Sequence, residues 1–137
     1  MNHRPTAVTT RRPLPITILA TISALAVLKD LIDLFGKPVG ADVQVWFGYR
    51  FEGMMAKILT IPHLLIYGYA AYGLLRMTRL GWWVAFIYLL YIPVSFILYM
   101  IGYTSGKTWE IVFAAVSILI IALIEIYLYK NRRLFAN

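Results

Sequence analysis

The chain has 137 residues, which is room for one domain, and 61% of them are hydrophobic while only 14% are charged. It contains no cysteine, which excludes disulfides, thiolate metal sites and thiol catalysis. The formal net charge is +7, but the basic residues gather at the ends of apolar segments, where membrane topology places them, so we expect no nucleic-acid partner.

Four apolar segments account for most of the chain, and each holds about 20 residues, the number that an α-helix needs to cross a bilayer. In chain order they are Leu14–Leu34, Gly53–Leu75, Trp82–Ile101 and Trp109–Tyr129. We therefore predict an all-α integral membrane protein made of one four-helix bundle. Any activity would then lie inside the bundle or at its rims.

The first apolar segment opens with two prolines and follows a short tail. Pro13 and Pro15 suit the first turn of a helix, where a missing N–H leaves no hydrogen bond unmade. Residues 1–12 are expected to form a cytoplasmic tail. The short turn of residues 76–81 joins the second and third segments, so these two helices must be antiparallel neighbours.

Residues 42–52, which link the first two segments, are too apolar for a free loop. Their large apolar side chains are Val43, Val45, Trp46, Phe47 and Tyr49. Tryptophan and tyrosine gather at the headgroup level of membranes. We therefore predict a short interfacial segment here, either a helix or a turn.

The placement of lysine and arginine predicts the orientation in the membrane. Eight basic residues fall on one side of the four segments: Arg4, Arg11, Arg12, Arg76, Arg79, Lys130, Arg132 and Arg133. Three fall in the loops of the other side: Lys37, Arg50 and Lys107. Cytoplasmic loops carry the excess of basic residues. We therefore expect both termini in the cytoplasm.

Two strings in the chain resemble those of a known group of proteins. One is R-P-L-P-I-T-I-L-A at residues 12–20, and the other is G-L-L-R-M-T-R-L-G-W-W at residues 73–83. Together they resemble a loose group of small four-span prokaryotic membrane proteins of uncharacterised function. The resemblance implies the four-span fold and a prokaryotic cytoplasmic membrane, and it carries no functional residue across.

Polar side chains share one face on the second and third segments. Helical projection aligns His63 with Tyr67, and Tyr88 with Tyr91 and Ser95. His63 stands near mid-bilayer, where an ionisable group is a functional candidate. These five residues are our predicted ligand-binding site. A bound lipid or quinone, a proton relay, a pigment ligand and a purely structural hydrogen-bond network are all open, so the cofactor is unknown.

Three further ionisable residues are predicted to be buried. Asp30 and Lys57 lie at similar depth on neighbouring helices, so we expect an ion pair between them. Glu125 is expected to reach towards the basic residues at the cytoplasmic end, or else to be a buried acid. The basic residues beside Asp30 and Asp33 favour ion pairs over a cation site, so no metal is predicted.

Three functional interpretations follow. The first is a non-enzymatic accessory or interaction subunit, or a self-associating bundle, because the chain has no extramembrane domain and no catalytic motif. The second is a binder or carrier of a small hydrophobic ligand such as a lipid, quinone or pigment, centred on His63 and the tyrosines. The third is a lipid-modifying enzyme with the layout of four-helix sterol isomerases, using Glu125 or His63 for acid–base work.

Overall fold

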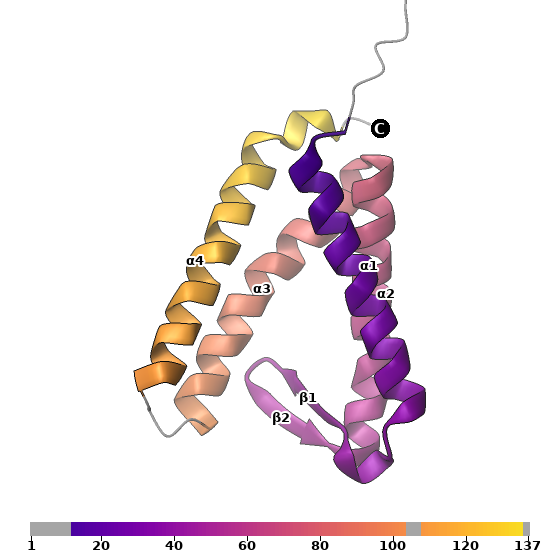
Figure 1. The fold of residues 1–137 in the computed structure, drawn as a ribbon, viewed down its shortest axis with the longest axis vertical. Helices are drawn as coiled ribbons and strands as arrows, with labels where there is room; N and C mark the ends of the chain where they lie inside the picture. Colours follow the sequence, from indigo (N-terminus) through magenta and orange to yellow (C-terminus); the bar gives the residue numbers. More distant parts are fainter. Residues whose placement is uncertain (1–11, 104–107, 136–137) are drawn as a thin grey trace, which may run out of the picture.

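The computed structural model describes residues 12–103 and 108–135, and this part of the chain is mostly helical (Figure 1). It holds four long helices: α1 (Leu14–Gly36), α2 (Gly53–Arg76), α3 (Arg79–Tyr103) and α4 (Thr108–Lys130). Between α1 and α2 lie a short 3-10 turn, η1 (Val39–Ala41), and two strands, β1 (Val43–Trp46) and β2 (Tyr49–Glu52). A second 3-10 turn, η2 (Arg132–Leu134), follows α4.

Three of the helices are long and apolar enough to cross a membrane, namely α2, α3 and α4. The prediction of a small membrane protein with long apolar helices is therefore confirmed for these three helices. Helix α1 forms over the predicted range, but its last turns carry Lys29, Asp30 and Asp33. Its role as a fourth span stays a prediction.

The link between α1 and α2 is a β-hairpin, so the expectation of an all-α chain with a short helix or turn here was wrong. Strands β1 and β2 are antiparallel, and Trp46 pairs with Tyr49. Phe47 and Gly48 therefore make a two-residue turn, with φ of 49° and 81°. Two positive φ values in a two-residue turn match the right-handed twist of the flanking strands, which favours a tight hairpin.

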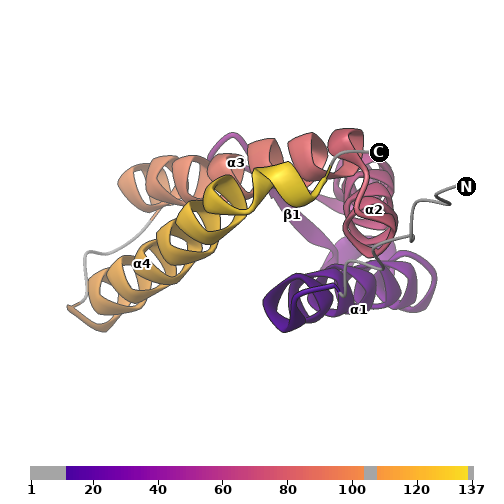
Figure 2. The same cartoon turned by 90° about the horizontal axis from the view of Figure 1, so that it is seen from above.

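The helices meet at one end of the molecule and diverge towards the other. We call the first the turn end, where residues 77–78 join α2 to α3, and the second the hairpin end. The hairpin lies in the angle between α2 and α3 (Figure 1). Helix α1 packs along α2 and α4 packs on α3, whereas α1 and α4 separate towards the hairpin end (Figures 1 and 2). The four helices are therefore open on one side.

The tightly packed apolar core lies at the turn end. It contains buried side chains from all four helices and from the segment after α4: Ile16, Ala20, Ala70, Leu74, Trp82, Ala85, Leu128 and Phe135. The indole Nε1 of Trp82 donates to the Leu128 carbonyl at 3.0 Å, which ties α3 to α4. Helix α2 is capped by Met77, whose backbone has the left-handed conformation. The N–H of Met77 donates to carbonyls in the last turn of the helix.

Two glycines let the backbones of α2 and α3 touch beside residues 77–78, which join these two helices. A Cβ on Gly73 would overlap the Cα of Gly81, and a Cβ on Gly81 would overlap backbone atoms of Gly73. The turn itself is closed by a 2.9 Å hydrogen bond from the Thr78 N–H to the Gly73 carbonyl. The pairing of α2 with α3 therefore starts from a contact that only glycine permits.

Candidate functional site

His63 lies near the middle of α2, and its side chain is 17% exposed. Its Nδ1 is 3.4 Å from Oδ2 of Asp30 on α1, and its Nε2 contacts the Tyr88 hydroxyl on α3. A carboxylate accepts hydrogen bonds, so Nδ1 carries the proton of the neutral imidazole and Nε2 accepts. The Tyr88 hydroxyl then donates to His63. One imidazole thus joins three helices.

Tyr67 packs against the rings of these two residues. Its ring lies edge-on to His63 and to Tyr88, with centroids 5.2 and 5.1 Å apart. Tyr67 therefore adds one more aromatic ring and one more hydroxyl to the group around His63.

The hairpin supplies backbone donors to two hydroxyls of α3. The Phe47 N–H donates to the Tyr91 hydroxyl at 3.0 Å, and the Gly48 N–H donates to Oγ of Ser95 at 3.1 Å. A hydroxyl that accepts a hydrogen bond still has its own hydrogen to donate. Tyr91 and Ser95 are therefore held in place by the hairpin while each keeps one donor for another molecule.

The five residues predicted as a ligand site line one pocket of about 190 Å³: His63, Tyr67, Tyr88, Tyr91 and Ser95. Its other walls are Val45, Ile92 and Phe96. Tyr88 and Tyr91 also border a second pocket of about 390 Å³, whose remaining walls come from the hairpin, α2 and α3 and are mostly apolar. The structure thus brings the predicted residues together, next to an apolar space.

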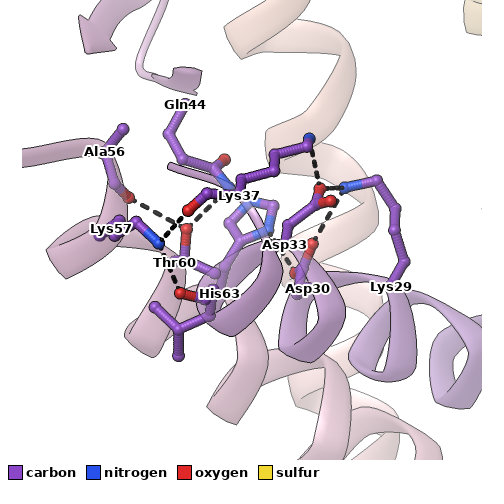
Figure 3. Close-up of polar contacts among 10 residues, drawn as sticks. Lys29, Asp30, Asp33, Lys37, Gln44, Ala56, Lys57, Thr60 and His63 are labelled. Carbon is purple, nitrogen blue, oxygen red and sulfur yellow. Dashed lines mark hydrogen bonds and ion pairs between the residues drawn. The ribbon is translucent and has the colours of Figure 1, made fainter. Parts of the chain in front are cut away.

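Asp30 is 4% exposed, and it does not pair with Lys57, so that sequence prediction was wrong. Its carboxylate faces His63 and Nζ of Lys29, which is 3.3 Å from Oδ1 (Figure 3). Nζ of Lys57 instead donates to the carbonyls of Leu34 and Lys37, at 2.6 and 2.7 Å. The last carbonyls of a helix lack intrahelical partners. Lys57 satisfies them at the end of α1, and depth alone could not predict this.

The hairpin end is fastened by short polar contacts (Figure 3). Gln44 on β1 donates from Nε2 to Oγ1 of Thr60 on α2 at 3.0 Å. Asp33 is 2.8 Å from Nζ of both Lys29 and Lys37. The contact of Gln44 holds the hairpin against α2, whereas the two ion pairs of Asp33 stabilise the last turns of α1 itself.

Glu125 on α4 is 7% exposed, and neither carboxylate oxygen has a hydrogen-bond partner in the described part of the chain. The expected reach towards Arg76, Arg79 or Lys130 was therefore wrong. Glu125 lies towards the turn end, as those basic residues do, but its side chain is buried. Neither of its oxygens bonds to His63.

Sequence reasoning missed the contribution of the hairpin to this site. The ring of Trp46 lies edge-on to His63 at 5.2 Å and 5.9 Å from the Tyr91 ring. Its Nε1 is buried without a hydrogen-bond partner among the described residues. The available signal was the alternation of Val43, Gln44 and Val45, which has the two-residue period of a strand.

No protein-family model, curated protein or solved structure matches this chain. Its function must therefore be argued from the chemistry of its own side chains.

Proposed function

We propose that this membrane protein binds a small hydrophobic ligand, whose uncharged polar end sits in the pocket beside His63. The observation that carries the proposal is the convergence of His63, Tyr67, Tyr88, Tyr91 and Ser95 on one pocket. An aliphatic interior would suit a membrane protein at lower cost, because buried polar groups must find partners. A polar cluster with hydrogen-bonding capacity to spare favours an occupant.

The spare hydrogen bonds indicate the chemistry of that polar end. Tyr91 and Ser95 each keep a hydroxyl hydrogen, and the buried Nε1 of Trp46, which lines the adjoining pocket, is a third donor. The Tyr67 hydroxyl offers an acceptor oxygen. No lysine or arginine lines this pocket. A carbonyl or hydroxyl group fits such a set, whereas a phosphate or carboxylate would lack a cation. A quinone or a lipid alcohol is therefore the favoured class.

The two pockets also indicate the shape of the ligand. A volume of about 190 Å³ holds a polar end but not a whole drug-sized molecule. The adjoining pocket of about 390 Å³ offers apolar walls to the rest. A ligand with a flat ring next to Tyr88 and Tyr91 and an apolar chain beyond that ring would fit these two pockets. Aromatic side chains pack well against such rings.

Fluorescence quenching by a short-chain benzoquinone tests the proposal, because Trp46 lies beside His63. We expect the purified chain to be quenched on titration, and Trp46→Phe to remove most of that change. His63→Leu should weaken the binding about tenfold, since it breaks the hydrogen bond to Tyr88 and leaves Oδ2 of Asp30 without its donor.

Tyr69→Phe is the matched control for Tyr67→Phe, because Tyr69 lies on the same helix and is 40% exposed. We expect Tyr67→Phe to weaken binding and Tyr69→Phe to leave it unchanged. If His63→Leu lowers the folded yield while each folded molecule binds the quinone as before, the polar cluster is structural only and the proposal is wrong.

An interaction subunit is the second candidate, favoured by the one-sided packing of α4. In α4, the buried residues among those described are Ala114, Glu125 and Leu128. Among the long helices, α4 packs mainly on α3. Purification in mild detergent followed by native mass measurement separates the candidates. A stoichiometric partner subunit would favour the second, and a bound lipid-like molecule the first.

We also propose that α1 is a fourth span and that the turn end is cytoplasmic. Arg76, Arg79 and Lys130 lie at helix termini of the turn end, whereas Asp30 and Asp33 lie towards the hairpin end. A cysteine introduced at Gly40, beside the hairpin, should react with an impermeant thiol reagent added to intact cells. A cysteine at Leu134 should react only after the membrane is opened. Labelling in the opposite sense would reverse the topology.

A further inference from the structure

A third and larger pocket lies at the turn end, away from the His63 site. Its volume is about 540 Å³, and it is formed where α3 begins and α4 ends. Arg79 is the first residue of α3, and Arg132 and Arg133 belong to η2. Trp83 and Tyr129 are among its aromatic walls. Three arginines from two separate elements thus line one pocket.

The positive charge of this pocket is not balanced within the described chain. The ion pairs in residues 12–103 and 108–135 all lie towards the hairpin end, on Asp30, Asp33 and Glu52. Glu125 is the acidic residue of α4 towards the turn end, but its oxygens make no hydrogen bond there. Within residues 12–103 and 108–135, no carboxylate forms an ion pair with these three arginines, so all three can bind an anionic group of another molecule.

Part of the pocket is held rigid by its own contacts. The Arg132 guanidinium stacks over the Tyr129 ring, 4.1 Å from the centroid, and its Nη1 donates to the Tyr129 carbonyl at 3.2 Å. Trp82 lies edge-on to Trp83 and donates to Leu128. A stacked arginine keeps its remaining N–H groups free, and its planar fork suits the oxygens of a phosphate.

We infer that this pocket binds a phosphate group. Because the pocket lies at the ends of membrane-length helices, this phosphate belongs to the headgroup of an anionic phospholipid. Exposed Trp83 and Tyr129 stand at the ends of membrane-length helices, the level at which tryptophan and tyrosine meet headgroups. Basic pockets between helices at this level recognise anionic headgroups. A soluble phosphate compound would satisfy the same guanidinium groups, so the experiment below separates the two sources.

The test uses the full chain in nanodiscs, with native mass measurement of the lipids that stay bound after transfer to detergent. In phosphatidylglycerol we expect one retained lipid, and in phosphatidylcholine none. The triple variant R79Q/R132Q/R133Q should retain phosphatidylglycerol at least about tenfold less well. Arg76→Gln is the matched control for the single change Arg79→Gln, because each removes one positive charge at the same end and Arg76 lies outside the pocket.

Four further results decide the interpretation. Equal loss of lipid in Arg76→Gln and Arg79→Gln would show general attraction to an anionic surface and would overturn the site. Inorganic phosphate that displaces the lipid from the wild-type chain at low concentration would overturn the lipid as its source. A triple lysine variant, which keeps the charge, should fold and retain lipid better than the glutamine variant. His63→Leu should retain phosphatidylglycerol normally, so failure of the quinone proposal would leave this one standing.

Discussion

Replacing Gly73 or Gly81 by alanine should abolish the close pairing of α2 with α3 and lower the free energy of unfolding by about 3 kcal/mol or more. Each added Cβ would overlap backbone atoms of the other helix, which cannot move away as a flexible side chain can. The two helices would have to separate, and the packing of Leu74 and Trp82 beside them would loosen. Reversible unfolding of the purified chain, followed by tryptophan fluorescence, measures the loss.

Gly102→Ala is the matched control on the same helix as Gly81, since a Cβ there meets no atom within 4 Å. We expect that change to be neutral or slightly stabilising, because alanine is the better helix former. If the alanine variants at residues 73 and 81 are as stable as Gly102→Ala, the backbone contact beside the turn does not exist in the folded protein.

Asp30→Leu should cost about 2–3 kcal/mol, more than the removal of Asp33, although Asp33 makes the shorter ion pairs. Asp30 is buried and is the acceptor for Nδ1 of His63, so its loss leaves a buried donor unpaired. Asp33 pairs only with Lys29 and Lys37, which are 67% and 47% exposed. Exposed pairs of this kind contribute roughly 0–1 kcal/mol.

The comparison of Asp30→Leu with Asp33→Leu is made by denaturant unfolding in one detergent. Asp30→Asn should recover part of the loss, because its carbonyl oxygen still accepts from His63. Equal costs for Asp30→Leu and Asp33→Leu would mean that surface charge, and not the buried hydrogen bond to His63, governs this region.

The helices could be predicted from the sequence because their signals are local. Apolar runs of membrane length, Pro13 at the start of α1 and the short link after Arg76 each act within a few residues. The polar faces of α2 and α3 could also be projected from helical periodicity alone. Those two faces meet in the structure, where one pocket is lined by His63, Tyr67, Tyr88, Tyr91 and Ser95.

The partners of charged groups could not be predicted in the same way. Depth placed Asp30 level with Lys57, but the direction of each side chain depends on how α1 rotates against α2. Lys57 reaches backbone carbonyls, which carry no signal in the sequence. The hairpin was missed because its aromatic residues also suit a membrane interface. Composition alone did not separate a strand from an interfacial anchor.

The divergence of the helices has a consequence for the surrounding bilayer. Helices α1 and α4 approach each other at the turn end and separate towards the hairpin end (Figures 1 and 2). If all four helices span the bilayer, as proposed above, the protein would therefore occupy unequal areas in the two leaflets. A wedge of this kind displaces more lipid from one leaflet than from the other. The bilayer relieves the imbalance by bending, so the molecule should concentrate where the leaflet around its hairpin is stretched by curvature.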